Sequence, residues 1–224
     1  MPDERRPAPG PAGLALVHAA RRLWEAGLIA GGDGNLSVRL GPDRLLVTPG
    51  GCPKADLAPA DLVLVNLAGD RLGGFRRATS ELDLHLRIYR HCPEAGAVVH
   101  AHPPTATGLG LAGEGLPADV LPELTVLLGE VPLVPYAQPG TPALGEAVVP
   151  FLAGRSGLLL ANHGAVTWGA DLDQARIRME SMEHGAKILL RARLAGRVTR
   201  LTAGEVRALM DPRREPAHDQ ADRG

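Results

Sequence analysis

Three histidines have the type and spacing of a metal site. His100 and His102 end an apolar stretch at residues 96–102, which is typical of a β-strand, and two prolines follow. Because successive strand side chains alternate between faces, the two imidazoles point the same way. His163 follows a second apolar run at residues 158–160 and could meet the pair at the mouth of a sheet. Three imidazoles with one open position are typical of a catalytic zinc site.

Five short motifs appear in the order and approximate spacing of the class II aldolase/adducin family. They are Gly34-Asn35-Leu36-Ser37, Val47-Thr48-Pro49-Gly50-Gly51, Thr79-Ser80-Glu81, His100-Ala101-His102 and Asn162-His163-Gly164. Over about residues 14–195 the chain resembles the L-fuculose-1-phosphate aldolase branch of this family. The resemblance implies an α/β fold of three layers, in which a nine-stranded, mainly antiparallel sheet lies between helical layers. It also implies a fourfold-symmetric homotetramer.

The same resemblance assigns roles at the site. His100, His102 and His163 would bind a divalent metal, and Glu81 would transfer a proton and close the fourth metal position in the empty enzyme. Zinc is the expected metal, although three imidazoles and a carboxylate also accept manganese or cobalt. A cation held by neutral imidazoles keeps its Lewis acidity and can stabilise an enediolate.

Donors for a substrate phosphate lie in glycine-rich loops and at a predicted helix start. Ser80 and Asp83 have the spacing of a capping box, which would place Glu81 in the first turn of a helix with free backbone N–H groups. The predicted phosphate-binding residues are Asn35, Gly50, Gly51, Thr79 and Ser80. The family pattern has Ser or Thr where Gly50 stands, so that contact must come from the backbone.

The chain departs from the fuculose-phosphate branch on the aldehyde side of the site. That branch uses tyrosines on a mid-chain loop and near the C-terminus to manage protons, whereas this chain has only Tyr89 and Tyr136. Glu123 stands at the mid-loop position, and nothing aromatic follows Trp168. Glu123 is therefore predicted to be a second catalytic acid/base, with a solvated loop carboxylate as the alternative.

The favoured function is that of a metal-dependent aldolase. It would reversibly cleave a ketose 1-phosphate, such as L-fuculose 1-phosphate, to dihydroxyacetone phosphate and an aldehyde through an enediolate. A relative that uses the same site as a sugar-phosphate decarboxylase, dehydratase or 4-epimerase is the alternative. A non-catalytic, adducin-like module is a third hypothesis, and retention of all the histidines and Glu81 argues against it. Only Lys54 and Lys187 are present, and neither lies in a motif suited to a buried amine nucleophile.

Composition excludes several classes of function. A formal net charge of −1 and 22% charged residues give no footprint for nucleic acid. No run approaches the roughly 18 apolar residues of a membrane span, and Cys52 and Cys92 lack metal-ligand spacing. We therefore expect a cytoplasmic protein, and the resemblance implies that its partners are a small phosphorylated sugar and further copies of itself.

The pattern of apolar and turn residues predicts one domain at residues 14–210 between disordered tails at 1–13 and 211–224. The predicted helices cover residues 14–25, 82–90, 142–151 and a long segment from 172, with a short last helix after Thr202. The first should bury Leu16, Ala20, Leu23 and Trp24. The long helix has an apolar seam that requires a partner. Residues 36–40 and 44–48 predict a hairpin, residues 63–67 a strand, and residues 130–136 an edge or irregular strand.

Overall fold

The computed structural model describes residues 10–211, so the predictions for residues 1–9 and 212–224 lie outside the described part. The helical segments are α1 (Pro11–Glu25), α2 (Leu82–His91), α3 (Pro104–Leu111), α4 (Pro122–Leu127), α5 (Pro142–Val148), α6 (Leu172–Ala195) and α7 (Ala203–Leu209), with short 3-10 turns at Pro59–Asp61 and Val149–Phe151. The strands are β1 (Asn35–Gly41), β2 (Arg44–Val47), β3 (Val63–Val65), β4 (Arg71–Gly73), β5 (Ala97–Ala101), β6 (Leu133–Val134), β7 (Gly157–Leu160) and β8 (Gly164–Gly169). No helix among these is long and apolar enough to cross a membrane.

The strands form one sheet in the order β4-β3-β2-β1-β5-β8-β7-β6. All neighbours are antiparallel except β6 and β7, which are parallel. Within the described residues the sheet has eight strands rather than the nine that the resemblance implied. The two bridges outside it, Pro49 with Ala78 and Leu116 with Val131, are isolated pairs that do not extend into ladders. The edge strand expected near residue 133 is confirmed as β6.

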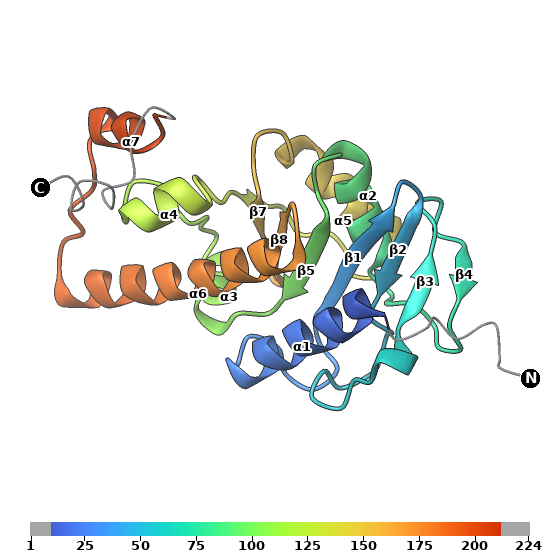
Figure 1. Cartoon of the computed structure of the whole chain (residues 1–224). Helices are drawn as coiled ribbons and strands as arrows, with labels where there is room; N and C mark the ends of the chain where they lie inside the picture. The colour runs from blue at the N-terminus through green and yellow to red at the C-terminus, as the bar shows by residue number, and fades with distance from the viewer. Residues whose placement is uncertain (1–9, 212–224) are drawn as a thin grey trace, which may run out of the picture.

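Helices cover both faces of the sheet and make the predicted three layers (Figure 1). Strand alternation divides the core, because Val99 packs into the cluster on the α1 and α6 side while Val98 packs into the cluster on the α2 and α5 side. His100 therefore points toward α2. The sheet thus presents the metal-site histidine to the helix that follows Glu81.

The start of α2 differs from the capping-box prediction. Glu81 itself is the N-cap residue, and no side chain caps the helix. The backbone N–H of Glu81 donates to Thr79 Oγ1 at 3.2 Å, and Asp83 instead forms an ion pair with Arg87. Glu81 therefore lies just before the helix, where its carboxylate can turn toward the sheet.

Other local predictions have mixed outcomes. The α1 stripe buries Leu16 and Leu23, but Trp24 is 43% exposed because it lies one step around the helix from that stripe. This helix begins at Pro11, inside the predicted N-terminal tail, because proline suits a first helical turn. The seam of α6 is buried as predicted, and it packs on β8 and β5 as well as on helices. Helices α3 and α4 were not expected from the sequence.

A buried carboxylate ties α6 to the segment after the metal-site histidines. Glu183 is 2% exposed and accepts hydrogen bonds from the backbone N–H groups of Thr105 and Ala106, each at 2.9 Å for the closer oxygen. Lys187 Nζ lies 3.2 Å from the same carboxylate. Glu183 thereby accepts from the free backbone N–H groups in the first turn of α3, a helix that starts two residues after His102.

We predict that Glu183→Gln destabilises the fold by about 1–3 kcal/mol, because an amide replaces a charged acceptor facing two N–H donors. Urea unfolding followed by circular dichroism measures the loss. Glu180→Gln is the matched control on the same helix. The side chain of Glu180 is 30% exposed, and its buried partner Arg176 keeps a second ion pair with Asp173, so the loss in Glu180→Gln should stay below about 1 kcal/mol. Equal losses in the two variants would contradict the capping role of Glu183.

Candidate functional site

The three predicted metal ligands meet at one end of the central strands. His100 is the next-to-last residue of β5, His102 follows that strand, and His163 lies in the turn between β7 and β8. One nitrogen from each of the three rings lies within 4.8 Å of the others. Asn162 supports the turn with φ of 56°, a conformation that asparagine tolerates better than most residues. A side chain at Gly164 would start 2.6 Å from the His102 ring, so glycine keeps that ring in place.

The hydrogen bonds of His100 define which nitrogen is available. Its Nδ1 donates to the backbone carbonyl of Ala165 at 2.9 Å, which directs Nε2 toward the cluster. That Nε2 lies 3.1 Å from Nε2 of His102 and 3.1 Å from Oε2 of Glu81. This arrangement is typical of metal-ligating histidines, in which a backbone acceptor orients the ring.

Glu81 joins the histidines from the opposite side. Its Oε1 lies 3.2 Å from Nε2 of His163, and its Oε2 accepts a hydrogen bond from Asn35 Nδ2 at 2.9 Å. Burial alone would raise the pKa of Glu81, but the hydrogen bonds and charges of His100 and His163 outweigh burial and hold it well below its usual range. The carboxylate is therefore ionised at neutral pH.

The donor set fits a divalent cation. Nδ1 of His163 is buried and has no hydrogen-bond partner in the described structure, and the buried Oε1 of Glu81 has only Nε2 of His163 close to it. Burial, followed by the neighbouring His100 and His163, lowers the pKa of His102 to about 4, so this ring is neutral at pH 7. A neutral imidazole is the form that binds metal. Neutral nitrogens and one anionic oxygen around a common centre match a zinc-type ligand set.

A cavity of about 230 Å³ opens beside these groups. It brings together all the residues predicted for phosphate binding with Glu81, His102 and His163. Its lining consists of Gly32, Asp33, Gly34, Asn35, Pro49, Gly50, Gly51, Thr79, Ser80, Glu81, His102, Pro139, Gly140 and His163. No arginine or lysine is among them, so an anion here would be held by neutral donors and by any metal.

The residues predicted to bind phosphate differ in whether their backbone N–H groups are free to donate. The backbone N–H groups of Gly51 and Ser80 donate to no protein acceptor within residues 10–211, whereas that of Gly50 donates to Arg77 O at 3.2 Å. Gly50 therefore offers space rather than a free donor. Gly51 has φ of +65°, a left-handed conformation that glycine adopts at little cost.

Lys54 is buried beneath the cavity, which the sequence analysis did not expect. Its Nζ donates to the carbonyls of Gly32 at 3.2 Å and Cys52 at 2.9 Å. Burial lowers its pKa, and the nearby Cys52 and Asp33 act in the opposite direction. Lys54 thus links the two glycine loops that form one wall of the cavity.

Glu123 does not join the site within this chain. It lies in the first turn of α4, is exposed, and is absent from the cavity lining. Its catalytic role remains a prediction that a single chain does not support.

The sequence analysis missed a group of buried side chains behind Glu81. His85 and Tyr89 follow Glu81 at intervals of four on α2, and Ser37 follows Asn35 by two on β1. These spacings place each set on one face of its element, so the two sets can meet. The spacing was visible in the sequence, but which face pairs with which depends on packing.

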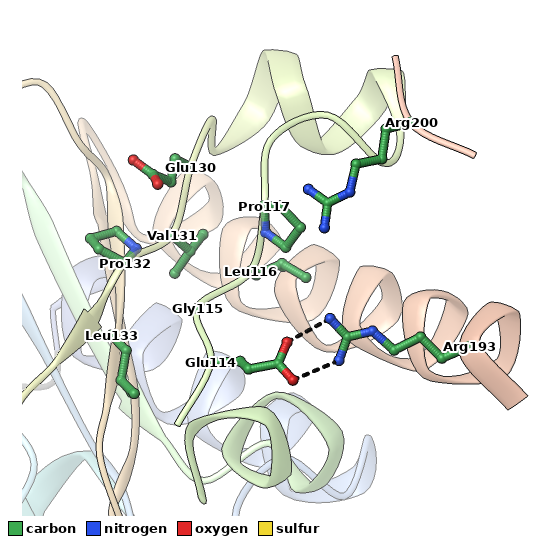
Figure 2. A pocket seen from close by; sticks show the side chains of 10 residues that line it. All are labelled: Glu114, Gly115, Leu116, Pro117, Glu130, Val131, Pro132, Leu133, Arg193 and Arg200. Carbon is green, nitrogen blue, oxygen red and sulfur yellow. Dashed lines mark hydrogen bonds and ion pairs between the residues drawn. The ribbon is translucent and has the colours of Figure 1, made fainter. Parts of the chain in front are cut away.

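A second hollow, of about 360 Å³, lies away from the histidines beside α6 (Figure 2). Its arginines are already paired. Arg193 binds both carboxylate oxygens of Glu114, at 3.1 and 2.6 Å, and Arg200 pairs with Asp119 at 3.0 Å. None of the predicted site residues lines it, so the histidine cavity is the better candidate for chemistry.

Comparisons with known proteins identify the family of the chain. Residues 14–190 match the family model described as Class II Aldolase and Adducin N-terminal domain. The 3-oxo-tetronate 4-phosphate decarboxylase of Escherichia coli strain K12 is 35% identical over 199 residues, covering 87% of this chain and 92% of that protein. The 5-methylthioribulose-1-phosphate/5-deoxyribulose-1-phosphate aldolase of Rhodospirillum rubrum is 38% identical over 162 residues, covering 71% of this chain and 72% of that protein.

A solved structure of an L-fuculose 1-phosphate aldolase superposes with a TM-score of 0.85 at 29% identity, covering 92% of this chain and 97% of that one. The likeness thus extends from sequence motifs to the whole three-layer fold. The chain belongs to the class II aldolase/adducin family.

Proposed function

We propose that this protein is a metal-dependent lyase that decarboxylates a phosphorylated 3-oxo sugar acid to dihydroxyacetone phosphate. The observation that carries the proposal is the cavity in which Glu81 and the imidazoles face the unpaired N–H groups of Gly51 and Ser80. The similarity to 3-oxo-tetronate 4-phosphate decarboxylases supports this choice of substrate.

Decarboxylation and aldol cleavage share one intermediate. In a 3-oxo acid, breaking the bond between the carboxyl carbon and C2 sends its electron pair toward the C3 carbonyl oxygen. In a ketose 1-phosphate, cleavage between C3 and C4 leaves the same three-carbon enediolate. A divalent cation held by His100, His102 and His163 would supply the positive charge that stabilises this anion.

The residues of the chain divide the remaining work. Gly51, Thr79 and Ser80 bind the phosphate through N–H and hydroxyl groups, which fixes the three-carbon unit in the cavity. Glu81 takes a proton from solvent and delivers it to the enediolate carbon, which completes a hydroxymethyl group. The neighbouring imidazoles lower the pKa of Glu81, so its carboxylate is ionised at neutral pH, which is the form that can receive a proton.

The groups available to assist the leaving group favour decarboxylation over aldol cleavage. Carbon dioxide leaves without proton transfer, whereas release of an aldehyde requires a base that takes a proton from the C4 hydroxyl. If the histidines hold the metal and Glu81 serves the enediolate carbon, only Asp33 remains as a titratable group in the cavity lining. Its side chain is 57% exposed and lies 3.7 Å from His102.

Aldol cleavage of a ketose 1-phosphate, the function favoured by the sequence, is the second candidate. The 38% identity to an aldolase for 5-deoxyribulose 1-phosphate supports it. Dehydration is represented by methylthioribulose-1-phosphate dehydratase of Methylococcus capsulatus, at 34% identity over 183 residues. We propose zinc as the metal, a homotetramer as the assembly and the cytoplasm as the location.

We predict that metal-loaded protein exchanges one hydroxymethyl proton of dihydroxyacetone phosphate in heavy water, because this is the protonation step in reverse. Proton NMR measures the exchange, and a chelator should abolish it. Glu81→Gln should slow it by about 10²-fold or more while the metal stays bound. Glu123→Gln is the matched control and should exchange normally. If Glu81→Gln were normal and Glu123→Gln slow, the base would be Glu123.

We predict that His163→Ala loses both bound metal and exchange, because three nitrogen ligands become two. Metal content is measured by mass spectrometry after dialysis. His184→Ala is the control, since His184 is exposed on α6 and lies outside the cluster. Full metal content in His163→Ala would remove His163 from the ligand set.

We predict that the protein releases carbon dioxide from 3-oxo-tetronate 4-phosphate with kcat/KM at least about tenfold above that for aldehyde release from 5-deoxyribulose 1-phosphate. About tenfold corresponds to about 1.4 kcal/mol of transition-state stabilisation. Coupled enzymatic assay of dihydroxyacetone phosphate quantifies both reactions. The opposite ratio would make aldol cleavage the main activity.

A further inference from the structure

Two short rows of polar side chains face each other in the interior between α2 and the sheet. His85 and Tyr89 lie four residues apart on one side of α2, with Glu81 four residues earlier at its N-cap, and Asn35 and Ser37 share one face of β1. Both rows lie on the α2 side of the sheet, where Tyr89 also belongs to the apolar core cluster (Figure 1).

The two rows interlock through a continuous chain of hydrogen bonds. Tyr89 OH lies 2.9 Å from Ser37 Oγ, which lies 2.7 Å from His85 Nδ1. On the other side of the ring, His85 Nε2 lies 2.5 Å from Asn35 Oδ1. Asn35 Nδ2 then donates to Glu81 Oε2 at 2.9 Å.

The last acceptor determines the direction of the whole chain. The ionised carboxylate of Glu81 can only accept, so the Asn35 amide turns its N–H₂ toward Glu81 and its oxygen toward His85. An amide oxygen also only accepts, so His85 donates from Nε2. In a neutral ring Nδ1 must then accept, and it accepts from the Ser37 hydroxyl. The Ser37 oxygen in turn accepts from Tyr89.

Burial makes this chain of hydrogen bonds sensitive to the loss of any one partner. His85 and Ser37 are fully buried, and Asn35 and Tyr89 are at most 4% exposed. Burial, followed by the neighbouring His100, lowers the pKa of His85 to about 3, which keeps its ring neutral. Because water cannot replace a lost partner here, a break in the chain would leave a buried polar group unsatisfied.

We propose that His85 is a positioning residue that acts through Asn35 to hold Oε2 of Glu81 and so fixes the orientation of the carboxylate at the cavity. Oε1 is the other carboxylate oxygen and lies 3.2 Å from Nε2 of His163. The inference rests on the proposed function, because it specifies how the carboxylate of Glu81, the proposed base, is oriented. It extends the catalytic machinery from the cavity wall into the core.

A purely structural role predicts a different response to substitution. If His85 only filled space in the core, an apolar residue such as leucine would be tolerated at least as well as glutamine. If His85 acts by donating to Asn35, glutamine should retain function, because its amide N–H₂ can reach the position of Nε2. Leucine should not, because it has no donor.

The first experiment is ¹⁵N NMR of histidine-labelled protein, which reports the tautomer of His85 whether or not the protein is active. We expect a neutral ring that is protonated at Nε2 and unprotonated at Nδ1 between pH 6 and 8. A ring protonated at Nδ1 would reverse the chain and overturn the inference.

The second experiment compares His85→Gln with His85→Leu in the dihydroxyacetone phosphate exchange assay, at equal metal content. We expect His85→Leu to lose about 10²-fold in exchange rate, the scale of a misplaced general base, and His85→Gln to stay within about tenfold of the parent. The same pair at His91, an exposed histidine on α2, is the control and should leave exchange unchanged.

The outcomes separate the inference from the function on which it rests. Equal or better exchange in His85→Leu than in His85→Gln, with an active parent, would refute the positioning role alone. If both His85 variants fail to fold, Tyr89→Phe is used in their place. This change removes the hydroxyl that donates to Ser37, so the ¹⁵N signal of His85 Nδ1 should shift. An unshifted signal would refute the proposed chain of hydrogen bonds. A metallated parent without exchange would refute the proposed function, while the tautomer would still decide the direction of the chain.

Discussion

A carboxylate removed from water must be surrounded by partners, and the position of Glu81 imposes this requirement on the rest of the structure. Its side chain is only 10% exposed, and an isolated buried charge would cost several kcal/mol. The imidazoles of His100 and His163 and the amide of Asn35 meet the requirement. Each partner comes from a different segment, so the carboxylate is stable only when the whole sheet is assembled.

Sheet topology explains how these segments converge. Antiparallel pairing of β5 with β8 sets the end of one strand beside the start of the other, so His100 lies next to the turn that carries His163. Pairing of β1 with β5 sets Asn35 directly opposite His100. The site is therefore formed at one end of three neighbouring central strands. Glu81, which lies just before α2, adds its carboxylate from the helical layer on one face of the sheet.

The cavity combines a strongly polar metal side with a weakly charged phosphate side. Because its lining within residues 10–211 has no arginine or lysine, the proposed phosphate recognition would depend on backbone N–H groups, hydroxyls and the fixed shape of the glycine loops. Lys54 contributes from below by tying those loops together through their carbonyls.

The sequence by itself determined the features that follow from local periodicity. The common face of His100 and His102, the buried seam of α6 and the short last helix after Thr202 all follow from intervals of two to four residues. The ordered motifs also identified the family and the residues that line the cavity. Only the tertiary structure decided that Glu81 lies just outside its helix, that Lys54 is buried, and that Glu123 is not among the residues of this chain that line the cavity. It also decided that His85 faces Asn35, because contacts between elements depend on packing register, which no local spacing encodes.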